Sequence, residues 1–309
     1  MSISAGSICL LQPLGVIGIR GPDARRFLQG QLSNDMEQLG QLLQQPARDG
    51  AGPRLLRAGL HSPQGRTLAL LGLVTEAQDA LLAILPREII DATLATLRRY
   101  VLRAKVSLAD QSDAWRLYGL LPAAQSAGDG LSVLYEDTRR LLLLRANDTA
   151  PAGEPLPYEH WHALDVAAGL PQVYAASAGQ FVAQMLNLDC IGAISFTKGC
   201  YTGQEVIARA HYRGRVKRRM QRYLSSAPLQ LSPGDSGQLS SGGNFTVVDS
   251  ARRADGRCEF LAITALAAAA REASESAPSE LAVDGAPVGG EPSRRVDAEL
   301  LPLPYTLPQ

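Results

Sequence analysis

The stretch Lys198-Gly-Cys-Tyr-Thr-Gly-Gln-Glu205 is the most informative part of this sequence. Thr202 and Glu205 have the Thr-x-x-Glu spacing of a capping box, which predicts that a helix begins just after Thr202. Cys200 would then lie close to the positive end of that helix, with Lys198 nearby, and both features favour a thiolate. A buried cysteine beside an ordinary helix start fits the same residues, so they leave a structural and a chemical role for Cys200 open.

A run of cations follows this motif. Residues 206–222 include no acidic residue but seven Lys and Arg residues: Arg209, Arg213, Arg215, Lys217, Arg218, Arg219 and Arg222. A solvated face is the ordinary explanation of such a run. The alternative is a local anion site, for the phosphates of tRNA or for an acidic small molecule.

The composition of the rest of the chain excludes several classes of protein. The 309 residues carry 30 Lys and Arg against 30 Asp and Glu, so the whole surface is not built to bind nucleic acid. Hydrophobic residues make up 46% and charged residues 19%, which excludes wholesale disorder. The four cysteines lack a C-x-x-C pair, which excludes a disulfide scaffold and predicts no metal site. No Ser/His/Asp arrangement or phosphate-binding loop is present, which excludes a hydrolase or an NTPase.

The compartment expected from the sequence is the cytoplasm, with no membrane partner. The first cation is Arg20, and the apolar stretch before it contains Pro13, Gly15 and Gly18, unlike a secretion signal. No apolar run approaches the ~20 residues that a membrane-spanning helix requires.

The hydrophobic spacing predicts the main elements. Helices are expected over residues 22–32, over 90–101, and over 161–168, where Gly169 would end the helix. A hairpin is expected within residues 60–74, around Ser62-Pro-Gln-Gly65, and a strand over 130–144. From residue 224 onward, short strands and Gly/Ser turns predict a small β domain, and the low-complexity segment near 267–290 reads as an insertion.

The motif, together with Ala208-Arg209 and Tyr212-x-Gly214, resembles the signature of the YgfZ family of folate-binding proteins, relatives of the glycine-cleavage T-protein (aminomethyltransferase). The resemblance extends over nearly the whole chain. Its other blocks are Gly21-x-Asp23-Ala24, Phe27-Leu-Gln-Gly-Gln31, Asn34-Asp35, Ser62-Pro-Gln-Gly-Arg66, Ala168-Gly-Leu-Pro171, Asn187-Leu-Asp189 and Leu303-Pro-Tyr305.

This resemblance implies an α+β, aminomethyltransferase-like fold. Residues 1–214 would form a folate-binding region of two interleaved α+β modules, with a joint near 151–157. Residues 215–309 would form a small C-terminal β-barrel, and the three modules would be arranged like a ring.

The resemblance also implies a function. The chain would bind tetrahydrofolate or a one-carbon derivative, and it would act in iron–sulfur cluster assembly or repair and, directly or indirectly, in tRNA modification. Its partners would be folate and iron–sulfur client proteins, with direct tRNA contact as a further hypothesis. The alternative is a folate-dependent aminomethyl transferase, so the resemblance leaves enzymatic activity open. The T-protein has an aspartate in the strand after the hairpin turn, whereas residues 67–71 here contain no carboxylate, which argues against transfer.

The resemblance assigns roles to individual residues. Cys200 would be the reactive thiol, and Trp161 would contact the folate rings. The remaining folate-binding residues would be Lys198, Tyr201, Gln204, Glu205, Arg209 and Arg213, the two arginines lying near the acidic tail of the folate.

Overall fold

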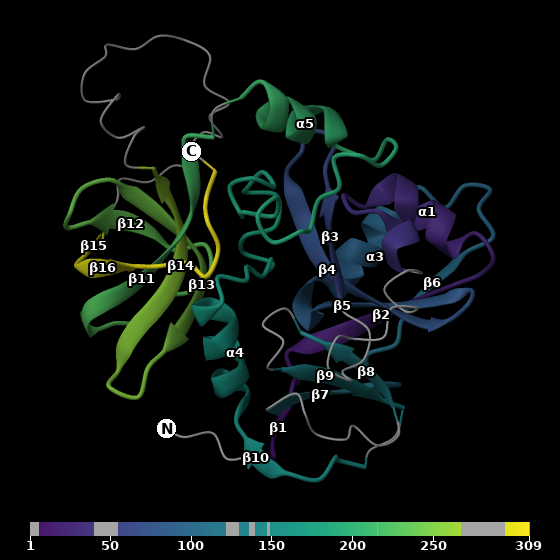
Figure 1. Cartoon of the computed structure of the whole chain (residues 1–309), viewed down its shortest axis with the longest axis horizontal. Coiled ribbons are helices and arrows are strands. Elements are labelled where there is room, and N and C mark those ends of the chain that lie inside the picture. Colours follow the sequence, from purple (N-terminus) through teal and green to yellow (C-terminus); the bar gives the residue numbers. More distant parts are fainter. Residues whose placement is uncertain are drawn as a thin grey trace. The chain divides into compact units, whose positions relative to one another are not determined.

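The protein divides into two compact units whose segments alternate along the chain. The computed structural model describes residues 6–39, 55–121, 130–135, 140–146, 149–214, 216–266 and 294–308 (Figure 1). The first unit comprises Met1–His61, Leu68–Trp161 and Gly192–Thr202, and the second comprises Ser62–Thr67, His162–Ile191 and Gly203–Gln309. The expected division at residues 214 and 215 stays a prediction.

A five-stranded sheet forms the centre of the first unit. Its strand order is β3 (Leu56–His61), β4 (Thr67–Ala77), β5 (Ala80–Pro86), β2 (Leu14–Arg20) and β6 (Ser107–Asp110). β2 pairs antiparallel with both β5 and β6, so it lies inside the sheet. Every residue of β5 is buried, as expected for a short continuous apolar run.

Two helices pack their apolar faces into this unit. In α1 (Ala24–Gln31) the buried residues Ala24, Phe27 and Leu28 have the spacing of one helix face. A 3-10 turn, η1 (Arg87–Ile89), leads into α3 (Ile90–Arg98), which buries Ile90, Leu94 and Leu97. Both helices confirm the predictions for residues 22–32 and 90–101, although α3 ends three residues earlier than expected.

A second five-stranded sheet completes the first unit. Its order is β10 (Glu154–Leu156), β1 (Ser7–Leu10), β7 (Arg116–Leu121), β9 (Leu141–Arg145) and β8 (Leu131–Leu134). The prediction of one strand over residues 130–144 is wrong, because β8 and β9 are separate strands that pair antiparallel, Leu131 opposite Leu144. β10 occupies the segment expected to join the two modules; that role stays a prediction.

The hairpin and the last two helices have the predicted positions. The turn between β3 and β4 contains Gly65 in the left-handed region (φ 72°), and a Cβ there would lie 2.9 Å from Val206 Cβ. α4 (Tyr158–Ala167) precedes Gly169, which is also left-handed (φ 65°), as predicted for a helix stop. α5 (Gln204–Tyr212) follows the cysteine motif.

The C-terminal part of the second unit is a six-stranded, nearly closed sheet, which confirms the expected β-rich module (Figure 1). Its order is β15 (Arg295–Val296), β12 (Ser236–Leu239), β13 (Asn244–Arg252), β14 (Arg257–Ala265), β11 (Arg218–Pro228) and β16 (Ala298–Leu301). Its core includes stacked Tyr223 and Phe260, with ring centroids 5.4 Å apart, and Phe245. The expected insertion near 267–290 lies outside the described residues.

Together these elements are the mixed α+β class that the sequence predicted. Over the described part of the chain, none of the helices has the length and apolar character needed to cross a membrane.

Candidate functional site

Lys198 anchors the cysteine motif in the first unit. Its Nζ donates hydrogen bonds to the backbone carbonyls of Gln29 (2.7 Å), Leu32 (2.7 Å) and Asn34 (2.8 Å). A lysine ammonium has three N–H donors, so these three carbonyls use all of them. Lys198 is also only 8% exposed. Lys198 therefore anchors the segment that carries it to the first unit, and none of its three N–H donors remains for a ligand.

The charge of Lys198 also orders Tyr201. Nζ lies 5.1 Å from the centroid of the Tyr201 ring, within the range of a cation–π interaction. Burial lowers the pKa of Lys198 to about 8, while nearby Asp35 raises it, so the amine is mainly cationic at neutral pH. Burial raises the pKa of Tyr201 to about 12, so the phenol keeps its proton.

Further hydrogen bonds hold the start of this segment to residues 33 and 34. Asn34 Nδ2 donates to the carbonyls of Arg57 (2.7 Å) and Gly192 (2.8 Å). Ser33 Oγ donates to the carbonyl of Ala193 (2.7 Å) and accepts from the backbone N–H of Gly59 (2.8 Å). The segment that carries the motif is thus fixed at both ends within the first unit before any ligand arrives.

Cys200 differs from the other three cysteines in its environment. Cys200 is exposed, whereas Cys9 and Cys258 are buried and Cys190 is partly buried. Burial raises the pKa of Cys9, Cys190 and Cys258 to about 11, with nearby Asp189 adding to the effect at Cys190. Those three thiols are therefore protonated at neutral pH, and accessibility singles out Cys200 as the candidate nucleophile.

The predicted capping box is wrong, although α5 begins where it was expected. The N-cap is Gly203, whose backbone is left-handed (φ 82°), and no side chain caps the helix. Thr202 Oγ1 instead lies 3.5 Å from Gln31 Oε1. The left-handed turn at Gly203 redirects the chain before the helix starts, which separates Thr202 from the free N–H groups.

The other predicted residues of the motif lie on α5 in the second unit. Gln204 and Glu205 occupy its first turn. Glu205 and Arg209 lie four residues apart on one face of α5, whereas Arg213 is the residue just beyond the helix and has a non-helical backbone (φ −132°). All three side chains are exposed, so the helix and its C-terminal end offer two guanidinium groups and one carboxylate to solvent.

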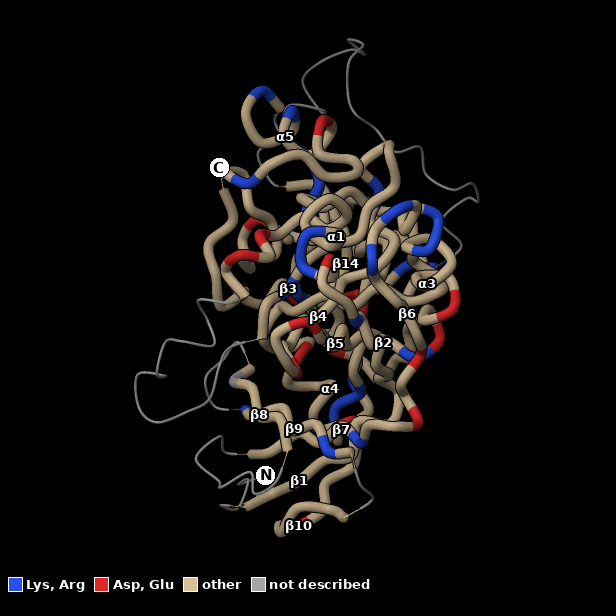
Figure 2. Tube along the Cα trace, turned by 90° about the vertical axis from the view of Figure 1, so that its right-hand side faces the viewer, with Lys and Arg blue, Asp and Glu red and all other residues tan. Residues whose placement is uncertain are grey.

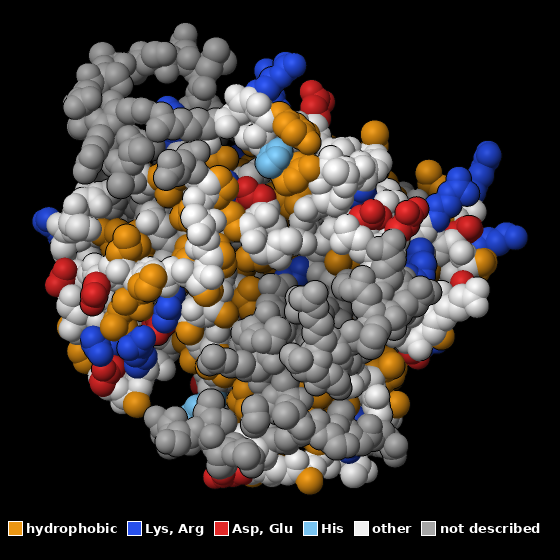
Figure 3. Space-filling view, viewed as in Figure 1, with side chains coloured by type: hydrophobic (Ala, Val, Ile, Leu, Met, Phe, Trp, Pro, Cys, Tyr) orange, Lys and Arg blue, Asp and Glu red, His pale blue; other side chains and the backbone are white. Residues whose placement is uncertain are grey.

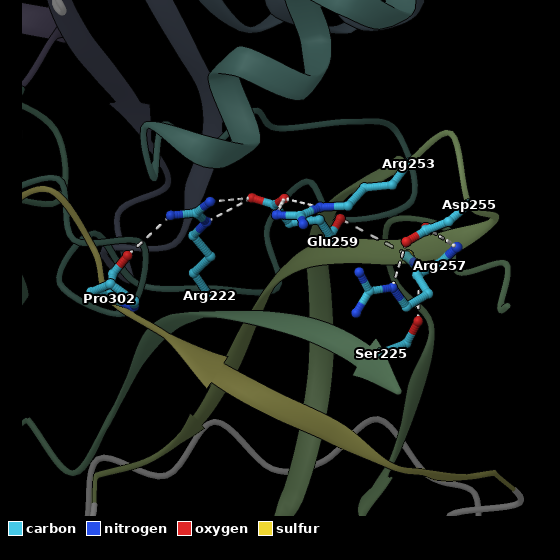
Figure 4. A network of polar contacts seen from close by, with 8 residues as sticks. Arg222, Ser225, Arg253, Asp255, Arg257, Glu259 and Pro302 are labelled. Atoms are coloured by element: carbon cyan, nitrogen blue, oxygen red, sulfur yellow. Dashed lines mark hydrogen bonds and ion pairs between the residues drawn. The ribbon is translucent and has the colours of Figure 1, made fainter. Parts of the chain in front are cut away.

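The cation run is partly neutralised by acids from elsewhere in the sequence, and a local anion site among its other members stays a prediction. Arg219 is 3% exposed and forms a two-point ion pair with Asp189, with distances of 2.9 and 2.8 Å. Arg222 Nε donates to Glu259 Oε1 (2.7 Å), and Arg253 Nε donates to Glu259 Oε2 (2.8 Å) (Figure 4). Two members of the run therefore serve the fold of the second unit.

Trp161 is fully buried (0% exposed) in the first unit. A Cβ at Gly119 would lie 2.2 Å from the indole ring, so the ring packs directly on that glycine. Tyr135 meets it edge-on at 5.0 Å between centroids, and the Arg140 guanidinium carbon lies 4.7 Å from its centroid. Among the described residues, no hydrogen bond or ring contact joins Trp161 to Lys198 or Tyr201, and its predicted folate contact stays a prediction.

His61 is a residue to which the sequence analysis assigned no role. It is 1% exposed, and neither ring nitrogen has a hydrogen-bond partner among the described residues. Its ring lies against Gly59, where a Cβ would be 2.4 Å from Nε2, and its centroid is 6.4 Å from that of Tyr201. The signal in the sequence is the Gly59-x-His61 alternation, which puts both residues on one face of β3.

Burial lowers the pKa of His61 to about 3 from its ordinary value of 6.5, which makes stability depend on pH. Between about pH 6 and about pH 4.5 the unfolded chain gains a proton at His61 and the folded chain does not, so acidification should destabilise the fold by about 2 kcal/mol through this residue. Urea denaturation of the wild type and of His61→Phe at both pH values measures the difference. Equal pH dependence in the two proteins would contradict the assignment.

A buried carboxylate organises a polar cluster in the second unit. Asp249 accepts hydrogen bonds from Tyr174 Oη (3.3 and 3.1 Å), and its Oδ1 lies 2.8 Å from His162 Nε2. The side chain of Asp249 is fully buried, so these partners offset the cost of its desolvation. Among the described residues, no group of three or more His, Cys, Asp or Glu side chains could hold a metal ion.

Comparison with known proteins identifies the family. No protein-family model matches the chain. The chain is 32% identical over 270 residues to the tRNA-modifying protein YgfZ of Enterobacter sp. (strain 638), covering 77% of this chain and 79% of the relative. The chain belongs to the YgfZ family. It is also 30% identical over 280 residues to the YgfZ protein of Serratia proteamaculans, covering 80% of each chain.

The fold of this YgfZ-family chain has a counterpart among solved structures. The glycine cleavage system aminomethyltransferase T from Bartonella henselae superposes with a TM-score of 0.60, covering 84% of this chain and 79% of that chain at 12% identity. The aminomethyltransferase-like fold expected from the motif is therefore confirmed.

Proposed function

We propose that this YgfZ-family chain is a tetrahydrofolate-binding accessory protein that supports tRNA modification. We further propose that it does so through the assembly or repair of iron–sulfur clusters in client proteins, in the cytoplasm. The proposal rests on the cysteine motif. Lys198 anchors this motif within an aminomethyltransferase-like fold, and Cys200 in the same motif is exposed. The names of the relatives support the link to tRNA modification.

The first unit contains groups that fit a flat, polar heterocycle such as a pterin. Tyr201 supplies an aromatic ring beside Cys200, and the neutral ring of His61 next to it has one donor and one acceptor without partners. A buried polar group that lacks partners is costly unless a ligand or water satisfies it. Lys198 would contribute by positioning Tyr201, and Trp161 by supporting the ring site from within the unit.

The second unit contains groups that fit the acidic tail of a folate. Arg209 on α5 and Arg213 at the C-terminal end of that helix are both exposed, and guanidinium groups can pair with carboxylates. Gln204 and Glu205, at the start of the same helix, would supply polar contacts. These roles follow from side-chain chemistry and exposure within this unit.

An accessory role is better supported than aminomethyl transfer. The strand after the hairpin turn is β4, and its one carboxylate belongs to Glu76, the penultimate residue. Glu76 pairs with Arg20 (2.8 Å). The strand therefore presents no acid near the turn, where the aminomethyltransferase chemistry expects one.

Titration of the full chain with tetrahydrofolate in a calorimeter tests the proposal. We expect saturable binding, and we expect Trp161→Phe to weaken it if the indole supports the ring site. Phe is preferable to Ala because a buried Trp→Ala change costs about 3–5 kcal/mol through the cavity it leaves. An aminomethyltransferase T in the same buffer is the positive control. If that control binds and this chain releases no heat, the folate proposal is wrong.

Replacement of Cys200 tests its chemical role. Cys200→Ser should fold normally, since the side chain is exposed, but should not restore iron–sulfur enzyme activity in a cell that lacks the protein. Cys190→Ser is the matched control and should restore activity, because burial raises the pKa of that thiol to about 11. Full restoration by Cys200→Ser would rule out the proposed role.

A further inference from the structure

A basic surface lies on the first unit, away from the cysteine motif in the sequence. We define it by six cations on α1 and around the segment that follows α3: Arg25, Arg26, Arg98, Arg99, Arg103 and Lys105. Figure 2 shows Lys and Arg gathered on α1 and on the chain beside α3. In Figure 3, basic side chains project from the right-hand edge, where α1 lies in Figure 1.

Backbone hydrogen bonds join the two parts of this basic surface. The backbone N–H of Lys105 donates to Asp23 Oδ2 (2.8 Å), and the backbone N–H of Asp23 donates to the carbonyl of Lys105 (3.4 Å). Asp23 immediately precedes α1, so the segment after α3 lies against the start of that helix. The cations of the two elements therefore contribute to one potential.

The cations of the basic surface are available for a partner. Arg26, Arg99, Arg103 and Lys105 are exposed, and none of the six forms an ion pair with another described residue. Arg25 donates one hydrogen bond to Thr75 Oγ1 (3.3 Å), and Arg98 donates one to the carbonyl of Leu108 (3.1 Å).

Apolar side chains are exposed among these cations. Leu102 is 90% exposed and Tyr100 is 37% exposed. Leu102 also has a positive φ of 28°, a region that costs energy for a residue with a Cβ. The fold therefore holds a large apolar side chain in solvent through a strained backbone, with an aromatic residue two positions before it.

The segment that presents these side chains is a series of fixed turns. The backbone N–H of Tyr100 donates to Leu97 (3.0 Å), that of Val101 to Arg98 (3.3 Å) and that of Ala104 to Val101 (2.7 Å). A surface that is ordered beforehand loses little conformational entropy when a partner binds.

We propose that this basic surface binds RNA, with the arginines and Lys105 on the phosphates and Tyr100 stacked on an unpaired base. This inference rests on the tRNA-directed part of the proposed function. Arginine forks and lysines recognise phosphate oxygens, and an exposed aromatic ring among them offers a stacking platform for a base. The cation run of residues 206–222 is less suited, because two of its members, Arg219 and Arg222 on β11, are already paired with Asp189 and Glu259.

The test is the binding of an unmodified tRNA transcript by the full chain, followed by fluorescence anisotropy. We expect Arg99→Glu/Arg103→Glu to weaken binding by about 100-fold at low salt and to reduce the slope of log K against log salt by about two. Tyr100→Ala should weaken binding by about tenfold with the slope unchanged, because stacking carries little salt dependence.

Arg252→Glu/Arg295→Glu is the matched control, since it makes the same change in net charge at two exposed arginines of the C-terminal sheet. We expect it to bind tRNA within about twofold of the wild type, the limit of non-specific charge effects. Equal weakening by the two double variants would overturn the proposal, and so would an absence of tRNA binding at low salt.

Anionic lipid is the other partner that cations around an exposed leucine could serve. Sedimentation with vesicles of phosphatidylcholine and phosphatidylglycerol tests this alternative. The RNA assignment would be overturned if the wild type bound vesicles but not tRNA, and if Leu102→Asp lost the vesicle binding. Tetrahydrofolate titration of the same preparations distinguishes failure of RNA binding from failure of the proposed cofactor. Folate binding without tRNA binding overturns this inference alone, whereas tRNA binding without folate binding overturns the proposed cofactor alone.

Discussion

Lys198→Met should lower the free energy of unfolding by about 4 kcal/mol, because it leaves three buried carbonyl groups without a donor. The carbonyls of Gln29, Leu32 and Asn34 all accept from Nζ at 2.7–2.8 Å. Hydrogen bonds to charged groups contribute about 1.5–3 kcal/mol each, and removal of the buried charge offsets part of their loss. Urea denaturation followed by tryptophan fluorescence measures the change, since both tryptophans belong to the first unit.

Two further variants make this prediction specific. Lys217→Met removes an exposed lysine and should leave the denaturation midpoint unchanged. Lys198→Arg should not restore stability, because the planar guanidinium cannot direct three donors at the same three oxygens. If Lys198→Met instead kept wild-type stability and lost only folate binding, Lys198 would be a ligand contact and the anchoring role would be wrong.

Local patterns were sufficient to predict most of the elements. Ala24, Phe27 and Leu28 repeat with the period of a helix, and Gly169 stops α4 because it adopts the left-handed conformation. The start of α5 was predicted correctly from a capping box that does not form. Glycine at position 203 allows a left-handed backbone at the N-terminus of α5, and this conformation replaces capping by Thr202. Both conformations are compatible with the same residues, so the sequence alone does not distinguish them.

The partners of the functional residues could not be predicted, because they come from distant parts of the sequence. The cation run has no acid within residues 206–222, yet Asp189 and Glu259 neutralise Arg219 and Arg222. The donors of Lys198 are taken by carbonyls more than 160 residues away, which no side-chain pattern reveals. The burial of Trp161 likewise depends on Gly119, more than 40 residues before it, where the lack of a side chain admits the indole ring.

Such long-range pairing also explains why the basic surface was overlooked. The cations on α1 and those after α3 are spaced in the sequence as on any solvent-exposed segment. Neither segment contains a long run of cations like the one that follows the cysteine motif. The two segments are brought together by the contact between Asp23 and Lys105 and by the pairing of β2 with β6, in which Arg20 lies opposite Ser107. The longest cation run in a sequence is therefore a poor guide to the most available positive charge, because buried acids neutralise part of it.

Asp189→Ala should lower the free energy of unfolding by about 3–5 kcal/mol, since it leaves the buried guanidinium of Arg219 without its counter-charge. The side chains of Arg219 and Asp189 are only 4% and 7% exposed, and Arg219 also donates to the carbonyl of Gln184 (3.0 Å). Thermal and urea denaturation followed by circular dichroism measure the loss. Asp255→Ala, which breaks the exposed pair with Arg257 (Figure 4), is the control and should not shift the midpoint measurably.

A double-mutant cycle separates the ion pair from the rest of this network. Arg219→Met in the Asp189→Ala background should recover much of the lost stability, because it removes the unpaired charge and replaces it with an apolar side chain of similar length. Recovery should be incomplete, since Gln184 then loses a donor to its buried carbonyl. Additive losses in the double variant would contradict the pairing, because the double variant no longer contains the unpaired buried guanidinium that destabilises Asp189→Ala.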